Sequence, residues 1–378
     1  MDATSFYQEL TRLLRQRAQE LGFSALGISD TDLSTYIPRA RAWIEQGNHL
    51  PLQWMAEQQP LKENPAQLVP GTLRIISLRM DYLPSRKGHI EVLKDPTKAY
   101  IARYALGRDY HKTLRKRIAL LGDFMRDWVR SHSPDAAIQY RAFVDSAPIM
   151  ERPLAEKAGL GWIGKNSLII NPTAGSFFLL GELFTNLPLP LDNQPVANQC
   201  GDCTACLTIC PTDAFSAPYS LKTERCIAYL TIENKGPIAL EFREPIGNRV
   251  FGCDDCQAIC PWNKWAGVAQ VADFAPRHRL DQADLLSLFN WDEQQFLYHT
   301  QGSALRRIDY RRFLRNLAIG LGNAPSNPDI IAALQRRLGD EALFEGETAW
   351  LKEHFAWALA QQQNPNRRRK RKIKRAAD

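Results

Sequence analysis

The chain lacks the features that mark membrane, secreted and disordered proteins. No stretch of it approaches the ~20 consecutive apolar residues of a transmembrane helix. The first ten residues, MDATSFYQEL, have no basic region followed by an apolar run, and no cysteine precedes residue 200. These absences argue against a secretory signal and a disulfide framework. With 44% hydrophobic and 24% charged residues, the 378-residue chain is globular in composition, and we expect a cytoplasmic protein with no membrane partner.

Positive charge is concentrated near the end of the sequence. Residues 367–375 read RRRKRKIKR and carry eight of the 48 basic residues, so the other 40 basic residues balance 41 acidic ones. We expect residues 363–378 to form a basic, disordered tail. Such a tail is equally compatible with simple solvation and with loose, salt-sensitive contact with nucleic acid phosphates.

The cysteines form two runs with metal-cluster spacing. The first run is C-x2-C-x2-C-x3-C followed by proline, the bacterial ferredoxin pattern, and the second repeats it with its first member displaced upstream. The first run comprises Cys200, Cys203, Cys206 and Cys210, and the second comprises Cys226, Cys253, Cys256 and Cys260. Eight thiolates are sufficient for two [4Fe–4S] clusters and one-electron transfer between them.

The ligand sets follow from the ferredoxin rule that the last cysteine of each run binds the other cluster. We therefore assign one cluster to Cys200, Cys203, Cys206 and Cys260, and the other to Cys210, Cys226, Cys253 and Cys256. Two structural zinc sites are the alternative. Zinc would explain neither the third cysteine of each run nor the proline that follows the fourth.

Apolar periodicity divides the chain into three folded parts and the tail. Helical and strand patterns alternate over residues 1–190, with strands expected at 23–29, 72–83, 138–144 and 177–183, which indicates a layered α/β domain. A proline-rich linker at 186–195 leads into a cluster module at 191–265. Residues 266–362 show only helical patterns, at 304–321, from 328, and at 348–361, like a degenerate HEAT-type repeat. The fold class is thus a multidomain mixture of α/β and α+β.

Basic residues also recur within the first of these C-terminal helical patterns. They are Arg306, Arg307, Arg311, Arg312 and Arg315. Some of them must share a helix face, which would suit either RNA phosphates or simple solvation.

The densest polar cluster follows the strand expected at 138–144. Asp145 ends that strand, where a carboxylate can project into a ligand crevice and act as a general acid. Helix capping is the competing role. The glycines of GLGWIGKN (159–166) fit no nucleotide motif and suggest a turn that approaches a large cofactor. Asp109 can cap the helix at 111–132, and we interpret His111 as a surface histidine at its start rather than a ligand.

Several motifs together resemble those of the epoxyqueuosine reductases. They are FVDSAPIMERPLAEKAGLGWIGKNSLIIN, GSFFLLGEL and the cysteine runs ending in GCDDCQAICPWN, with RYALGRDYHK upstream and LRNLAIGLGNAP downstream. The resemblance extends from about residue 10 to about residue 360 and leaves out the basic tail. It implies reduction of epoxyqueuosine to queuosine at the wobble position of tRNA with a GUN anticodon. It also implies cobalamin and two [4Fe–4S] clusters as cofactors, and similarity to the reductive dehalogenases.

The resemblance assigns roles to individual residues. Asp145 becomes the proton donor, and Arg152 becomes a contact for the tRNA, with an ion pair to Glu151 or Glu156 as the alternative. The implied corrinoid contacts are Lys62, Arg103, Asp145, Ile169, Leu180, Ile227, Cys253 and Asp254. The three aliphatic residues among them could equally be plain core. The motif D-x-H-x-x-G is incomplete because Leu114 replaces its glycine, so no histidine is expected to replace the lower cobalt ligand.

Two other functions remain open at this point. One is a corrinoid reductase of a small molecule, such as a dehalogenase, and the other is a ferredoxin-type electron-transfer subunit. The basic helix would serve no purpose in the first, and a 190-residue domain would be unexplained in the second. We expect a monomer that takes electrons from a cellular donor which the sequence does not identify. Tyr229 and Trp262 could stack on a base but are better explained as packing around the clusters.

Overall fold

The computed structural model describes residues 2–85, 88–192, 194–344, 346 and 349–364. Most of the expected tail, including the basic run at 367–375, lies outside these ranges. Within them, no helix combines the length and apolar character needed to cross a membrane.

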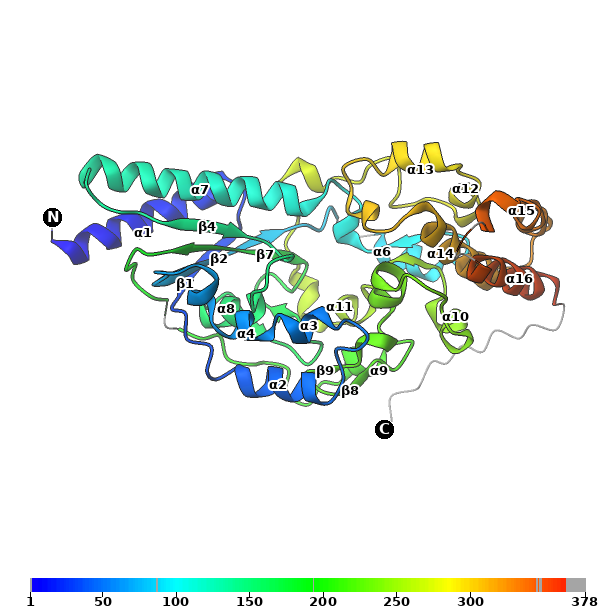
Figure 1. Cartoon of the computed structure of the whole chain (residues 1–378), viewed down its shortest axis with the longest axis horizontal. Coiled ribbons are helices and arrows are strands. Elements are labelled where there is room, and N and C mark those ends of the chain that lie inside the picture. Colours follow the sequence, from blue (N-terminus) through cyan, green and yellow to red (C-terminus); the bar gives the residue numbers. More distant parts are fainter. Residues whose placement is uncertain (1, 86–87, 193, 345, 347–348, 365–378) are drawn as a thin grey trace.

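A four-stranded sheet forms the centre of the N-terminal part (Figure 1). Its strands are β1 (Ala25–Ser29), β2 (Arg74–Asp81), β7 (Phe178–Thr185) and β4 (Tyr140–Phe143), in that order across the sheet. Each strand lies within a range expected from the sequence or within two residues of it. All three pairings are antiparallel, so this part is α+β rather than α/β.

Two long helices cover one face of the sheet (Figure 1). They are α1 (Ala3–Glu20) and α7 (Tyr110–His132), each amphipathic and each begun by an aspartate N-cap. Leu14 and Leu121 are fully buried against strand residues such as Ile76. Asp109 caps α7 as expected, with its carboxylate accepting from the His111 amide at 3.1 Å.

The opposite face carries shorter elements, with α8 (Glu151–Lys157) packed directly on β7, β2 and β1. Also described in this region are α2 (Ile37–Glu45), α3 (Trp54–Glu57), α4 (Gln59–Glu63), α5 (Pro65–Leu68), β5 (Trp162–Ile163) and β6 (Ile169–Ile170). Two of the GLGWIGKN glycines, Gly161 and Gly164, lie where the β5–β6 hairpin leaves no room for a side chain. A Cβ on Gly161, whose φ is 159°, would lie 2.4 Å from the Ile170 carbonyl oxygen.

The cysteine runs lie in a compact module that contacts both the N-terminal part and the C-terminal helices. Its elements are α9 (Ala205–Thr208), β8 (Phe215–Ala217), β9 (Ser220–Leu221), a π-helical turn (Tyr229–Glu233), α10 (Leu240–Ile246), β10 (Arg249–Phe251) and α11 (Asp255–Ala258). β10 pairs in parallel with β3 (Tyr100–Ile101) from the N-terminal part. Parts of the expected linker at 186–195 pack against the N-terminal part. Leu189 is buried in its core, and Asp192 forms an ion pair with Arg15 at 2.7 Å.

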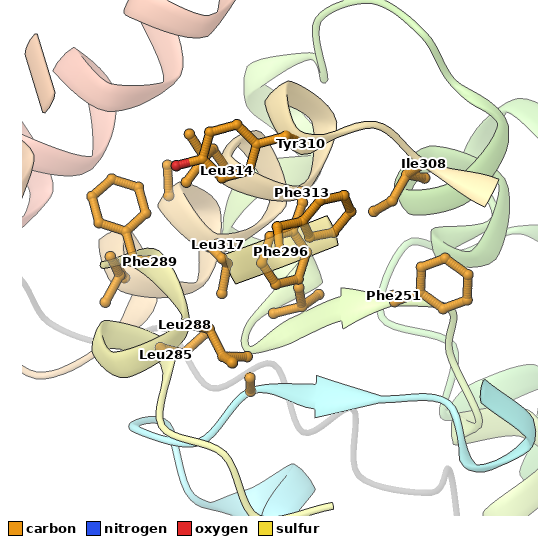
Figure 2. Packing of buried hydrophobic residues seen from close by; sticks show 14 of the residues in the cluster. Phe251, Leu285, Leu288, Phe289, Phe296, Ile308, Tyr310, Phe313, Leu314 and Leu317 are labelled. Carbon is orange, nitrogen blue, oxygen red and sulfur yellow. The ribbon is translucent and has the colours of Figure 1, made fainter. Parts of the chain in front are cut away.

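Helices of the C-terminal part enclose a second apolar core. They are α12 (Leu285–Phe289), α13 (Glu293–His299), α14 (Tyr310–Asn323), α15 (Pro328–Leu338) and α16 (Ala349–Gln363). The short helix α6 (His89–Lys94) contributes no described residue to it. Figure 2 shows Phe296 and Phe313 at its centre, with ring centroids 4.9 Å apart. Residues 99–106 of the N-terminal part also pack here. The helix expected at 304–321 is broken, because Asp309 caps α14 and leaves only a 3-10 turn before it.

The expected basic stripe on this helix is wrong for two of its members. Arg315 is fully buried and donates to the backbone carbonyls of Leu230, Asn234 and Gly236. Arg312 binds Asp309 and the Ile232 carbonyl. These arginines hold α14 against the cysteine module. They supply hydrogen-bond donors to the backbone carbonyls of residues 230–236, which follow Cys226.

Candidate active site

Asp145 lies at the turn between β4 and α8 and its carboxylate is held from α7. The Tyr110 hydroxyl donates to Asp145 Oδ2 at 2.6 Å, and His111 Nε2 lies 3.2 Å from the same oxygen. The backbone of Asp145 has a φ of 34°, a left-handed conformation that costs energy outside glycine. Its side chain is still 53% exposed, into the cavity described below. The turn therefore presents a carboxylate rather than capping a helix.

His111 connects two carboxylates. Its Nδ1 lies 2.8 Å from Asp109 Oδ1 while Nε2 faces Asp145. Burial opposes its charge, but the two acidic partners prevail and raise the pKa of His111 to about 9. Burial likewise opposes ionisation of Asp145, yet His111 and Tyr110 hold the pKa of Asp145 below its ordinary value. At neutral pH the pair is thus an imidazolium beside a carboxylate.

Asp145 stands between two adjoining cavities of about 380 Å³ each. Glu151, Arg152 and Ser167 also line both of them. The first cavity runs from Asp145 to the cysteine module and reaches Cys210, Cys226, Cys253 and Cys256. These are the four cysteines that the ferredoxin rule assigns to one cluster. The second cavity is lined by α2, α3 and α4.

The residues expected at the corrinoid are largely brought together. Asp145, Ile169, Leu180, Ile227, Cys253 and Asp254 all line the first cavity. Lys62 lines the second, where burial and Arg152 lower the pKa of its ammonium group. Arg103 lines neither cavity. It lies behind Asp254, whose carboxylate accepts from the Arg103 amide and from the Tyr100 hydroxyl, both at 2.9 Å.

The cysteines need a bound cation in order to ionise. Burial and neighbouring cysteines raise the pKa of Cys256 well above its ordinary value and that of Cys206 to about 11. The cysteines acting on Cys256 are Cys226, Cys210 and Cys206, and those acting on Cys206 are Cys260, Cys200 and Cys203. Such thiols ionise only when a cation compensates them, as bound iron would. The broad apolar wall opposite suits a large, flat macrocycle.

The first cysteine set, which comprises Cys200, Cys203, Cys206 and Cys260, lies nearer the surface. Cys203 is exposed, and Lys165 donates to its carbonyl at 3.0 Å. The Trp162 indole donates to Cys200 Sγ at 3.4 Å, and Trp262 stacks edge-on against Trp162. Trp262 therefore packs beside this set, which is the interpretation the sequence favoured.

Arg152 makes a contact different from the ion pair that was the alternative to its role as a tRNA contact. Its guanidinium donates to the Ser167 carbonyl at 2.7 Å, while Glu156 accepts from the Ile163 amide. The arginine thus crosses the boundary between the two cavities, where a substrate could reach it.

Sequence reasoning missed three polar residues of this site, namely Tyr110, His111 and Glu151. His111 was taken for a surface side chain, although the short spacing Asp109-x-His111 at a helix start was visible. Only the fold brings Tyr110 and His111 within hydrogen-bond distance of Asp145, which lies 34 residues after His111 in the sequence.

Comparison with known proteins now places the chain. Residues 62–146 match the family model described as epoxyqueuosine reductase QueG, DUF1730, and residues 199–263 match a 4Fe-4S double cluster binding domain. The epoxyqueuosine reductase of Salmonella typhimurium is 52% identical over 354 residues, which are 94% of this chain and 88% of that protein. The chain belongs to the epoxyqueuosine reductase family.

Two further comparisons extend this result. The Pseudomonas aeruginosa epoxyqueuosine reductase is also 52% identical, with 93% of this chain and 94% of that protein covered. A crystal structure of an epoxyqueuosine reductase with an epoxyqueuosine-modified tRNA-Tyr stem loop superposes with a TM-score of 0.80 and 25% identity. That match covers 95% of this chain and all of the other.

Proposed function

We propose that this reductase converts epoxyqueuosine to queuosine in tRNA, with Asp145 as the proton donor. The observation that carries the proposal is the cavity that places Asp145 opposite Cys210, Cys226, Cys253 and Cys256. Family membership at 52% identity supplies the substrate and the class of reaction, an oxidoreductase step of queuosine biosynthesis. Deoxygenation of an epoxide to an alkene consumes two electrons and two protons and releases water.

Two [4Fe–4S] clusters and cobalamin are the cofactors of this reaction. When bound, they supply single electrons and a reduced cobalt centre able to open the strained ring. Ile169, Leu180 and Ile227 would form the apolar wall for the corrinoid, and Asp254 would meet its polar edge. Lys62 stays a proposed contact from the adjoining cavity, and Arg103 would act through Asp254.

Asp145 is suited to deliver a proton to the departing oxygen. Tyr110 and His111 both engage Oδ2, so among the described residues Oδ1 remains able to reach a ligand. A substrate that excludes water from the cavity favours the neutral form of Asp145 and draws the proton from His111. Asp109 orients the imidazole for this transfer.

The tRNA partner is supported by the second cavity. It combines the cations of Arg39 and Arg152 with the rings of Trp43 and Trp54, which suits phosphate and base recognition in RNA. We propose that the wobble nucleoside of a GUN anticodon enters here and meets Arg152. We also keep residues 1–190, 191–265 and 266–362 as the catalytic, cluster and tRNA-binding units of a cytoplasmic monomer.

The test uses the full chain with anaerobically reconstituted clusters, cobalamin and a chemical reductant. tRNA carrying epoxyqueuosine is incubated with it, digested, and the nucleosides are weighed by mass spectrometry. We expect loss of one oxygen mass, dependent on cobalamin and slowed about 100-fold or more by Asp145→Asn, as for other general acids. The matched control is Asp135→Ala, an exposed aspartate after α7.

Other outcomes distinguish the alternatives. No conversion despite bound corrinoid and intact clusters would contradict the tRNA assignment and favour a small-molecule substrate. Electron transfer without corrinoid binding would favour a ferredoxin-type subunit. Full activity of Asp145→Asn would refute the role of this aspartate alone.

A further inference from the structure

Glu182 is a buried carboxyl group that the reaction described above leaves unused. It lies in the middle of β7, has no solvent exposure, and neither of its carboxylate oxygens has a hydrogen-bond partner among the described residues. An isolated buried carboxylate is strongly disfavoured relative to a neutral carboxylic acid. Natural sheets rarely place glutamate at a fully buried position, so its presence calls for an explanation.

The sheet register shows what surrounds Glu182. It pairs with Ser77 on β2 and Phe143 on β4, and the Ser77 hydroxyl is also buried without a partner among the described residues. Both side chains face α8, because directly paired residues share a sheet face and α8 packs on these strands. The cluster is therefore polar, enclosed and covered by the helix that begins with Glu151.

Glu151 connects this cluster to the active site. It occupies the first turn of α8 and lines both cavities beside Asp145. Burial, followed by the charge of Asp145, raises the pKa of Glu151 to about 7. Burial, followed by Glu151 and Asp145, raises the pKa of Glu182 well above its ordinary value. Three carboxyl groups thus lead from the sheet interior to the cavity, and they cannot all be ionised together.

The arginine side chains near this sheet face bind groups other than Glu182. Arg79 on β2 lies 3.6 Å from Asp81 and bonds to Ser24, and Arg141 on β4 lies over the Phe143 ring. Arg152 and His111 act on Glu151 and Asp145 at the cavity end. Negative charge on Glu182 would therefore be opposed by Glu151 without a matching cation.

We propose that Glu182 holds a proton as a neutral carboxylic acid and that this proton returns through Glu151 to Asp145 after Asp145 has protonated the departing oxygen. The inference rests on the proposed role of Asp145 and deepens it. The reaction needs two protons, and Asp145 can deliver only one at a time, the first of which it takes from His111. The first proton passes from Asp145 as the carbon–oxygen bond breaks, and the second follows through the same carboxylate to complete water. Both electrons come from the cluster and corrinoid cofactors, so atoms and charge balance.

The first test needs no turnover. Infrared difference spectra of the full chain, titrated through neutral pH, should show a protonated carboxyl absorption that persists above pH 7. Glu182→Gln removes the acid with little change in shape and should abolish that absorption. Thr185→Val is the matched control, since Thr185 is buried on the same strand but faces away from α8, and it should leave the absorption intact.

The second test is the pH profile of turnover. With Glu182→Gln, we expect kcat to fall about tenfold at pH 8 but little at pH 6, where solvent can reload Asp145, with KM unchanged. Glu151→Gln should show the same pattern, which provides a second reading if Glu182→Gln folds poorly by circular dichroism. A missing absorption in the wild type, or an unchanged pH profile in both variants, would refute the reservoir. Failure of the wild type on epoxyqueuosine tRNA would instead refute the proposed function, because the infrared result does not depend on it.

Discussion

Replacing His111 tests the proton donor most directly. The pKa of His111 rises from an ordinary value of 6.5 to about 9, mainly through hydrogen bonds to Asp109 and Asp145 that outweigh burial. A rise of that size corresponds to about 3 kcal/mol of preference for the protonated form. More than half of the Asp145 side chain is exposed, so solvent screening reduces the share of that pair to about 1 kcal/mol.

The sign of the pH dependence follows from the raised pKa. The stabilising charge on His111 is fully present below pH 6.5, and it is lost as the pH rises through about 9. We expect wild-type turnover to fall over the same range, because Asp145 then loses its proton source. His111→Gln keeps a polar side chain but cannot be charged, so kcat should fall about 10- to 100-fold near pH 7. KM for tRNA should change little.

The assay combines NMR with kinetics. Ring nitrogen resonances of labelled histidine should titrate near pH 9 for His111, and at a lower pH in Asp145→Asn, where Asp109 still raises the pKa of the imidazole. His132→Gln is the matched control, because His132 lies at the other end of α7, stacked on Trp128. A wild-type His111 that titrates near 6.5, or a fully active His111→Gln, would refute the reasoning.

Two other consequences concern the scaffold and the clusters. Arg315→Ala removes a buried guanidinium that serves backbone carbonyls of the cysteine module, and should lower the free energy of unfolding by about 3–5 kcal/mol in denaturant titrations. The half-buried Arg311→Ala, which loses one contact to the Ala342 carbonyl at 3.3 Å, should change it by about 1 kcal/mol or less; similar losses for both would contradict the buried role. Cys226→Ser should cut bound iron to about half in elemental analysis while the first cysteine set keeps its cluster, and full iron content would exclude Cys226 as a ligand.

The sequence carried more information about the clusters and strands than about the polar site. Cysteine spacing is local, so a double cluster domain could be predicted from it, and the two ligand sets stay a prediction of the ferredoxin rule. The strands around Ile76 and Leu183 were visible as buried apolar runs. Strand direction was not visible, because an apolar run does not record which neighbour it pairs with. The antiparallel order therefore emerged only from the structure.

Arg315 and Glu182 show why the role of a single polar residue could not be predicted from the sequence. Arg315 belonged to an apparent basic stripe, and only the carbonyls of residues 230–236, far back in the chain, explain its burial. Glu182 sits in an apolar strand with no local sign that Glu151 would cover it. Long-range contacts decide whether such a side chain is solvated, structural or functional, and composition cannot report them.

The arrangement of the first cavity separates the route proposed for electrons from the route proposed for protons. Cys253 and Cys256 line the cavity on the side of the cysteine module, so in the proposed reaction electrons would arrive from that side. His111 and Glu151 approach Asp145 from α7 and α8, on the side of the sheet domain, so the protons of the proposed reaction would arrive from there. Protons that met the reduced centre directly would be consumed without substrate. In the proposed mechanism, His111 and the buried glutamates would keep the protons behind Asp145 until the epoxide oxygen presents a base within reach, which would couple proton release to bond breaking.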